Sequence, residues 1–336
     1  MNILGIESSC DETAAAVVCD GVKVFSNVIA TSLQDHQRYG GIIPEIASRR
    51  QIEFIHGVVT ESLFLAHKTL KDLDAIAVTR SPGLIGSLLV GICFARGLSR
   101  ATGLPLVEID HIKAHLYANY LQLTDGVPAC PLNRLPAVGL VVSGGHSSLF
   151  YVKDFGNFKL LGVTRDDAAG EAFDKVARIL DLGYPGGPVI DRLAQSVVNN
   201  TNLTRSKEVR LKPFDQIKFP QAALAGSYDF SFSGTKTAVL YYTQKNKSKT
   251  DYSPAKVAYA FQESVVAVLV EKSLKACRKL RTNTLLIGGG VAANSTLRRQ
   301  LKAQALTQGV DVYFPPMVLC QDNAAMIAGL AYHSMK

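Results

Sequence analysis

The chain begins with Asn2-Ile-Leu-Gly-Ile-Glu-Ser-Ser-Cys-Asp-Glu-Thr13, and a second stretch of the same kind is Ala137-Val-Gly-Leu-Val-Val-Ser-Gly-Gly-His146. In each, a short apolar run ends in a polar or glycine-rich turn, and a second apolar run follows, which is typical of paired strands. A third strand is predicted after each pair, over residues 22–30 and 159–163. Each half of the sequence is therefore predicted to open with a three-stranded meander.

Helices alternate with short buried strands after each meander. In the first half the apolar periodicity predicts helices over 44–70, 81–103 and 111–123, with strands over 74–79 and 106–109. In the second half it predicts helices over 169–180 and from 187, 255 and about 292, with a strand over 284–287. This order predicts an α/β protein of two duplicated lobes around a nucleotide cleft, and it resembles the fold shared by actin, sugar kinases and heat-shock chaperone ATPases (the ASKHA fold). The alternative is an ordinary pair of doubly wound α/β domains, which would not need two matching hairpins.

The length of 336 residues corresponds to about two domains. We expect an N-terminal lobe over residues 1–125 and a C-terminal lobe over residues 126–320. The last helix, within residues 321–336, is expected to pack back on the N-terminal lobe.

The formal net charge is +8, from 36 Lys and Arg against 28 Asp and Glu, which favours a polyanionic partner. A basic stretch over residues 195–250 also contains Phe and Tyr, the combination that nucleic-acid surfaces use; a solvated loop with its rings tucked beneath it would explain the same composition. The longest apolar run, Leu84 to Phe94, contains two glycines and is followed by Arg96, so we expect no membrane span. Acidic residues within the first 18 positions argue against a secretory signal, so we expect a cytoplasmic protein.

His111 and His115 are four residues apart in a predicted helix. Side chains at this spacing lie on one helix face, so the two imidazoles could share a metal such as Zn or Fe, with a carboxylate completing the site. Two unrelated histidines would give the same spacing. A zincin-type protease is excluded, because the residue after His111 is Ile112 and not the glutamate that activates water.

Glycine-rich turns follow two strands and precede a helix, at Ser143–His146, Gly288–Gly290 and Tyr184–Pro188. Glycine lets a backbone approach a ligand, and turn N–H groups and helix N-termini bind anions. Three such turns favour a nucleotide-type ligand. Acidic residues at the ends of predicted elements would line the cleft or cap helices: Glu7, Asp11, Glu12, Asp166, Asp167, Glu171, Asp174, Asp191 and Asp322.

These stretches together resemble one family, the bacterial TsaD proteins, which are tRNA N6-adenosine threonylcarbamoyltransferases formerly called O-sialoglycoprotein endopeptidases. The resemblance covers essentially the whole chain. The motifs that carry it are Gly5-Ile-Glu-Ser-Ser-Cys-Asp-Glu-Thr13, Tyr39-Gly-Gly-Ile-Ile-Pro-Glu-Ile-Ala-Ser-Arg49, Ser81-Pro-Gly-Leu-Ile-Gly-Ser-Leu88, His111–His115, Val142-Ser-Gly-Gly-His146, Asp166-Asp-Ala-Ala-Gly-Glu-Ala-Phe-Asp-Lys175, Tyr184-Pro-Gly-Gly-Pro188, Phe230-Ser-Phe-Ser-Gly-Thr-Lys236, Gly289-Gly-Val-Ala-Ala-Asn294 and Asp322-Asn-Ala-Ala-Met326.

The resemblance implies a set of site residues and partners. His111, His115 and Asp322 would hold one divalent metal, Fe²⁺ or else Zn²⁺, and Asp11 would be needed for activity. Threonylcarbamoyl-AMP would be bound by Val141, Val142, Ser143, Gly144, Gly145, Asp174, Gly187, Asp191 and Asn294. The implied partners are tRNA, the smaller paralogue TsaB and the ATPase TsaE.

The implied reaction is acyl transfer to the N6 amine of adenosine 37 in tRNAs that read ANN codons. A Lewis-acid metal would make the carbamoyl carbonyl more electrophilic, and the Ser143–His146 turn would hold the leaving phosphate. Two alternatives stay open: a small-molecule kinase or carbamoyltransferase, which would ignore tRNA, and a non-catalytic scaffold, which would lack the His pair and Asp322. For tRNA, the candidate contacts are the basic stretch with Arg298 and Arg299.

Overall fold

Two five-stranded sheets form the centre of the protein, in a computed structural model that describes residues 1–123, 126–205, 217–221, 224 and 226–335. The first sheet contains β1 (Asn2–Glu7), β2 (Glu12–Cys19), β3 (Lys23–Thr31), β4 (Ala75–Ser81) and β5 (Leu106–Asp110). The second contains β6 (Ala137–Val142), β7 (Ser147–Asp154), β8 (Asn157–Val163), β9 (Thr284–Gly288) and β10 (Asp311–Tyr313).

The two sheets have the same topology. Their strand orders are β3-β2-β1-β4-β5 and β8-β7-β6-β9-β10. In each, the first three strands form an antiparallel meander, and the last two are parallel to the first strand. The predicted duplication is therefore confirmed at the level of strand order and direction.

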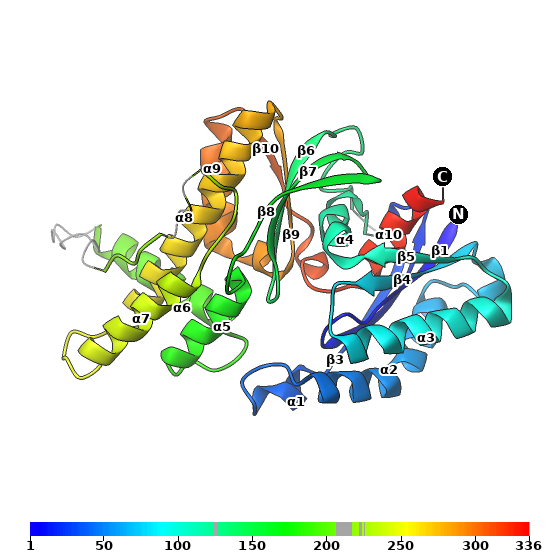
Figure 1. Cartoon of the computed structure of the whole chain (residues 1–336), viewed down its shortest axis with the longest axis horizontal. Coiled ribbons are helices and arrows are strands. Elements are labelled where there is room, and N and C mark those ends of the chain that lie inside the picture. Colours follow the sequence, from blue (N-terminus) through cyan, green and yellow to red (C-terminus); the bar gives the residue numbers. More distant parts are fainter. Residues whose placement is uncertain (124–125, 206–216, 222–223, 225, 336) are drawn as a thin grey trace.

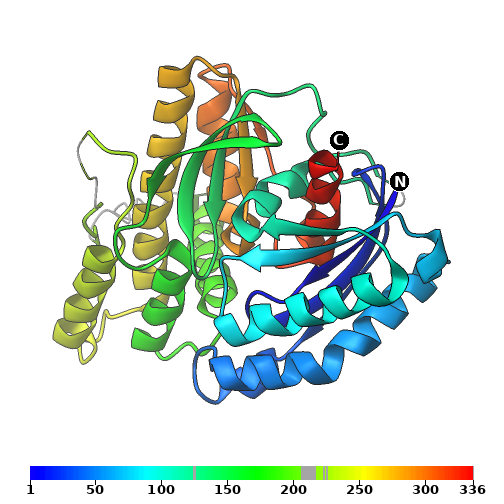
Figure 2. The same cartoon turned by 45° about the vertical axis from the view of Figure 1, so that its right-hand side comes forward.

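Helices cover the outer faces of both sheets and fill the space between them (Figures 1 and 2). The helices are α1 (Leu33–Gln37), α2 (Pro44–Leu65), α3 (Ile85–Thr102), α4 (His111–Tyr117), α5 (Ala169–Ile179), α6 (Gly186–Arg205), α7 (Ser233–Asn246), α8 (Pro254–Leu280), α9 (Ser295–Leu306) and α10 (Ala324–Ser334). Within the described residues, four short 3₁₀ turns cover Leu70–Asp72, Ala118–Tyr120, Gly290–Ala293 and Met317–Leu319.

The buried core between the sheets is built on α4 and α10. It joins apolar side chains of β1 and β2 to those of β6 and β7, with Leu116 and Ile327 among its fully buried members. The C-terminal helix α10 lies against β1 and β2, far from it in sequence (Figure 1). The chain positions at which one lobe ends and the other begins, residues 125 and 320, stay a prediction.

Two elements differ from those predicted. The helix predicted over 111–123 ends at Tyr117, because the Asn119 amide donates to the carbonyl of Leu116 and to that of Ile287 in β9, which pulls the chain into a 3₁₀ turn. Helix α7 lies in the stretch that was predicted as a basic surface or loop. Its buried positions are Thr235, Val239 and Thr243, so its inner face is mostly threonine and gives little apolar signal.

Candidate functional site

Helix α4 presents both histidines toward the space between the lobes. Asp110 caps the helix, since its carboxylate accepts a hydrogen bond from the Lys113 N–H at 2.9 Å, and His111 is then the first helical residue. His115 follows one turn later, with a ring centroid 4.6 Å from that of His111 and an interplanar angle of 78°. Both rings are buried. The predicted sharing of one helix face is confirmed.

Asp322 meets the two histidines from the other end of the chain. Its Oδ1 lies 3.1 Å from His115 Nε2 and 3.5 Å from His111 Nε2. Asn323, and not Asp322, caps helix α10: the Asn323 side-chain oxygen accepts a hydrogen bond from Met326 N–H. Because the neighbour caps the helix, the Asp322 carboxylate is left to face the imidazoles.

Burial and the mutual contacts of these side chains shift the pKa values of all three. Burial lowers the pKa of His111, but Glu7 and Asp322 outweigh it and raise this pKa to about 9. Burial raises the pKa of Asp322, but His111 and His115 outweigh it and lower this pKa to about 2. Burial lowers the pKa of His115, which keeps this imidazole neutral, the form that binds metals.

The residues present fit a metal ion. Within the described part of the chain, neither ring nitrogen of His115 has a hydrogen-bond partner, although the ring is fully buried. A buried polar atom left unpartnered is costly, and a metal bond would satisfy Nε2. One ligand atom from each of His111, His115 and Asp322 lies within 4.8 Å of the others. Two imidazoles and one carboxylate form a donor set that Fe²⁺ and Zn²⁺ accept, with positions left open for a substrate.

The turn after β6 offers two free backbone donors. Ser143 N–H bonds to the His146 carbonyl at 2.8 Å, and His146 N–H bonds to Ser143 Oγ at 3.2 Å, so the turn uses both groups itself. Among the described residues, no protein acceptor faces the N–H groups of Gly144 and Gly145, and a Cβ at either glycine would meet nothing within 4 Å. The sequence predicts that the whole turn binds a phosphate, but only the N–H groups of Gly144 and Gly145 are available to donate to it.

The other predicted nucleotide-site residues differ in what they can offer. The side chains of Val141 and Val142 are fully buried, so only their main chain could meet a ligand. Asp174 accepts from Gly186 N–H at 2.7 Å at the start of α6, where Gly187 has open space at its Cβ position. Burial raises the pKa of Asp174.

Asp191 on α6 and Asn294, the residue that caps α9, both bond to the first turn of α9. The Asp191 carboxylate accepts from the hydroxyl and the N–H of Ser295, at 2.8 and 3.2 Å. Asn294 accepts from Leu297 N–H and donates to Gln262 Oε1. In this arrangement their side chains set the position of α9, and a ligand contact would have to share or replace these bonds.

Asp11 lies in the turn between β1 and β2 and is 8% exposed. Its carbonyl accepts from the N–H and the hydroxyl of Ser32, at 3.4 and 2.9 Å. The neighbouring carboxyl of Glu12 has a pKa well above its usual range because of burial, then of Asp322 and Asp11. Ser9 of the same turn has its Oγ 3.2 Å from His111 Nδ1, so the turn lies beside the metal-ligand group.

Gln51 of α2 holds this turn in place, and sequence reasoning missed it. The residue is fully buried, and its Nε2 lies 3.3, 3.0 and 3.1 Å from the carbonyl oxygens of Ser8, Cys10 and Glu12. In the sequence, the only indication is a polar residue on the buried face of a mostly apolar helix, where Ser62 is the other buried polar residue.

Replacing Gln51 with leucine is expected to lower the free energy of unfolding by about 1–3 kcal/mol, because three turn carbonyls lose their donor in a buried place. Chemical denaturation measures this change. Gln304→Leu on the exposed side of α9 makes the same substitution and should change stability by less than about 0.5 kcal/mol. Equal stability of both variants would show that the Gln51 amide does not hold the turn.

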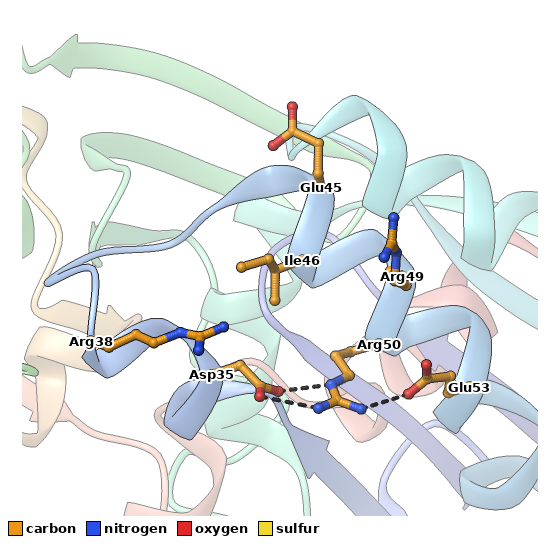
Figure 3. A pocket seen from close by; sticks show the side chains of 7 residues that line it. All are labelled: Asp35, Arg38, Glu45, Ile46, Arg49, Arg50 and Glu53. Atoms are coloured by element: carbon orange, nitrogen blue, oxygen red, sulfur yellow. Dashed lines mark hydrogen bonds and ion pairs between the residues drawn. The ribbon is translucent and has the colours of Figure 1, made fainter.

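The cavity shown in Figure 3 lies elsewhere, between α1 and α2, and has a volume of about 400 Å³. Arg50 crosses it, bonded to both carboxylate oxygens of Asp35 and to Glu53, while Arg38 and Arg49 also line it. None of its lining residues belongs to the predicted site. The Arg50 bonds fasten α1 to α2.

Three of the aromatic residues in the basic stretch cannot stack on bases. Phe219, Phe230 and Phe232 are buried in the core of the second lobe, which favours the alternative of rings tucked beneath the surface over a nucleic-acid surface built from them. Two of the cations are paired as well, Lys236 with Asp167 and Lys247 with Asp181. Lys207, Arg210, Lys212 and Phe214 lie outside the described residues.

Arg298 is also engaged within the protein. Its guanidinium donates to the carbonyls of Ala292 and Pro315 and lies over the Phe314 ring. Arg299 is half exposed and lies 3.6 Å from Glu263.

Across the described residues, no helix has the length and apolar character needed to cross a membrane.

Known proteins similar to this chain agree on one family. The family model for TsaD, tRNA N6-adenosine threonylcarbamoyltransferase, matches residues 23–329. The tRNA N6-adenosine threonylcarbamoyltransferase of Clostridium botulinum (strain 657 / Type Ba4) is 50% identical over 334 residues, which cover 99% of this chain and 92% of the relative. The protein of the same name from Clostridium kluyveri is 48% identical over 335 residues, with the same coverage of both chains.

Solved structures support the fold alone. Full-length HypF in its phosphate- and nucleotide-bound form matches with a TM-score of 0.60 at 13% identity, over 99% of this chain and 46% of that one. Component A of (R)-2-hydroxyglutaryl-CoA dehydratase from Acidaminococcus fermentans matches with a TM-score of 0.52 at 15% identity, over 99% and 98%. The two-lobed ASKHA architecture is thereby confirmed. On the match of its sequence from residue 23 to 329 and the half-identical relatives along its length, the chain belongs to the TsaD family of tRNA N6-adenosine threonylcarbamoyltransferases, which are acyltransferases.

Proposed function

We propose that this enzyme transfers the threonylcarbamoyl group from threonylcarbamoyl-AMP to the N6 amine of adenosine 37 in tRNAs that read ANN codons. The observation that carries the proposal is the buried His111–His115–Asp322 group at the junction of the two lobes, in a chain of this family. Fe²⁺ is the proposed metal, with Zn²⁺ as the alternative, and the proposed partners are TsaB and TsaE in the cytoplasm.

The N6 amine attacks the carbamoyl carbon, the bond from that carbon to the AMP phosphate oxygen breaks, and AMP leaves. A bound metal supplies Lewis acidity, which stabilises the negative charge that develops on the carbonyl oxygen. The N–H groups of Gly144 and Gly145 donate to the departing phosphate, and Asp11 accepts the proton of the amine. Adenosine 37 lies in a single-stranded loop, which can offer its base to a buried site.

The roles differ among the remaining site residues. Gly187 leaves space for the nucleotide at the start of α6, and the main chain of Val141, Val142 and Ser143 forms the floor of the turn. Asp174, Asp191 and Asn294 hold α6 and α9 around the nucleotide and offer it their remaining acceptor or donor capacity.

The test is a reconstituted transfer reaction. The protein is mixed with threonylcarbamoyl-AMP, TsaB, TsaE and unmodified tRNA in the presence of Fe²⁺ or Zn²⁺, and the tRNA is digested to nucleosides for mass spectrometry. Threonylcarbamoyladenosine is the expected product. Modification of a free metabolite with no change in tRNA would favour the small-molecule transferase instead.

Gly145→Val is expected to weaken AMP binding at least about tenfold, or about 1.4 kcal/mol, because the added methyl groups stand where the turn N–H groups face the phosphate. Stability should change by less than about 0.5 kcal/mol, since a Cβ at this glycine meets nothing within 4 Å. Calorimetric titration with AMP measures the affinity. Gly97→Val, at an equally open position on α3, is the matched control, and equal AMP affinities of the two variants would exclude the turn as the phosphate site.

Metal binding is expected to release a proton and to strengthen as the pH rises. Glu7 and Asp322 raise the pKa of His111 to about 9, so this imidazole carries two protons at neutral pH and must lose one to bind a metal. The apparent affinity for Zn²⁺ should therefore rise up to about tenfold per pH unit between about pH 7 and 9 and then level off. Calorimetry in buffers of different ionisation enthalpy counts the released proton, and an affinity that is constant over this range would contradict the prediction.

A further inference from the structure

Glu7 touches the first metal-ligand histidine from the side that faces away from Asp322. Its Oε2 lies 2.9 Å from His111 Nδ1, whereas His111 Nε2 is the ring atom near Asp322. The Glu7 side chain is 1% exposed and that of His111 6% exposed, so water does not compete for this contact. Nothing in the proposed reaction uses Glu7.

Two further donors determine which way the proton between Glu7 and His111 points. Thr79 Oγ1 donates to Glu7 Oε2 at 2.6 Å, and Ser9 N–H donates to Glu7 Oε1 at 2.5 Å. Because each carboxylate oxygen already faces a donor, Glu7 acts as an acceptor, and His111 Nδ1 carries the hydrogen that it accepts. Ser9 Oγ, at 3.2 Å from Nδ1, can accept from the same N–H.

The sheet explains why these residues meet. Glu7 ends β1, Thr79 lies near the end of β4, and His111 directly follows β5. These three strands are neighbours and run parallel, so their carboxyl ends come together at one edge. The arrangement is thus built into the backbone of the first lobe and does not depend on a flexible loop.

We propose that Glu7, held by Thr79 and Ser9, is a positioning residue that fixes His111 with its proton on Nδ1 and so presents Nε2 to the metal. This inference rests on the proposed metal site of the transferase. A carboxylate behind a ligand histidine fixes the ring orientation and makes the ligand nitrogen more basic. The loss of such a partner typically costs about 10- to 100-fold in metal affinity.

Glu7→Gln is the sharpest substitution, because the amide cannot satisfy all three neighbours. If its NH₂ replaces Oε1, it faces the Ser9 N–H, and two donors meet. If its NH₂ replaces Oε2, it faces His111 Nδ1, which must then accept and leave the proton on Nε2, the atom needed for the metal. The first arrangement keeps the tautomer but costs a buried contact between two donors, and the second disfavours the metal-binding tautomer itself.

The experiment measures Zn²⁺ affinity of the full-length protein by competition with a chelator. Glu7→Gln is expected to bind Zn²⁺ about 10- to 100-fold more weakly than wild type, and Thr79→Val to lose less, since it keeps the carboxylate. Glu108→Gln makes the same chemical change on the surface of β5, where Glu108 pairs with Arg80 and Arg96, and should bind like wild type. Equal affinities of Glu7→Gln and Glu108→Gln would overturn the proposal.

A second measurement does not depend on the folding of any variant. In ¹⁵N-histidine-labelled wild-type protein loaded with Zn²⁺, the His111 ring should show a protonated Nδ1 and a metal-bound Nε2. Binding of Zn²⁺ through Nδ1, or a proton on Nε2, would contradict the role of Glu7. Separately, His115→Ala tests the metal site itself: Zn²⁺ affinity unchanged by that substitution would mean that the proposed metal site is wrong, whatever Glu7 does.

Discussion

Replacing His115 with alanine is expected to reduce threonylcarbamoyl transfer about 1000-fold and to leave the purified protein without stoichiometric metal. The substitution removes the ring whose Nε2 lies 3.1 Å from Asp322 and leaves one imidazole and one carboxylate. Two ligands do not hold Fe²⁺ or Zn²⁺ in a fixed position, so the Lewis acid is lost. Its contribution of several kcal/mol to the transition state corresponds to about three powers of ten in rate, at about 1.4 kcal/mol for each.

The fold should survive this change, which makes the result interpretable. Among the described residues, Nδ1 of His115 has no partner and Nε2 contacts only Asp322, which keeps His111 as its other neighbour when alanine replaces the ring. Single-turnover transfer to tRNA and metal analysis of the protein are the measurements, with circular dichroism as the check on folding. His56→Ala, at an exposed position on α2, should retain full metal content. Full transfer activity in His115→Ala would exclude the metal centre from the reaction.

Much of the fold could be predicted because the two hairpins repeat a local pattern. The apolar runs at 2–7 and 137–142 have the length of strands, and the polar turns after them determine where each strand ends. Strand β10 could not be predicted from the sequence, because Asp311–Tyr313 has only three residues. It pairs in parallel with β9, and the residues around it do not indicate that pairing. Helix α1 was missed for a similar reason, because its five residues carry one buried side chain, His36.

Local sequence patterns predict the two histidines of the metal-ligand group but not Asp322. The four-residue spacing of His111 and His115 follows from helix geometry, but Asp322 is more than 200 positions away and enters through the packing of α10 between the sheets. The resemblance to a known family, and not the spacing, pointed to Asp322. Glu7 was visible only as an acid at a strand end, and its contact with His111 depends on the order of β1, β4 and β5, which hydropathy does not encode.

Buried contacts also decide which predicted residues can meet a substrate directly. Asp191 and Asn294 bond to the start of α9, and Ser143 and His146 close their own turn, so these residues shape the site as well as line it. The N–H groups of Gly144 and Gly145 have no such internal partner among the described residues. Residue type alone does not separate these cases, because the difference lies in bonds between distant segments.

Asp11→Asn is expected to slow transfer from threonylcarbamoyl-AMP to tRNA by about 100- to 10,000-fold, with metal content and AMP affinity unchanged. The amide keeps the size of the side chain but cannot accept the proton of the N6 amine, and general base catalysis is worth this range. The turn itself should keep its shape, because Ser32 and Gln51 bind its backbone carbonyls and not the Asp11 carboxylate.

The decisive comparison for Asp11 is the rate of the chemical step against the affinity for both substrates. Single-turnover transfer at saturating tRNA measures the rate, and titrations with AMP and with unmodified tRNA measure binding. Asp74→Asn is a matched control: Asp74 accepts the Asn2 N–H at an exposed position beside β4, away from the cleft, and its replacement should leave the rate of transfer as in wild type. A wild-type rate in Asp11→Asn would mean that the amine loses its proton elsewhere, and a weakened affinity for tRNA at a normal rate would make Asp11 a binding residue. Because metal content is measured in the same samples, a loss of rate through the neighbouring His111–His115–Asp322 group is separated from a loss of the base itself.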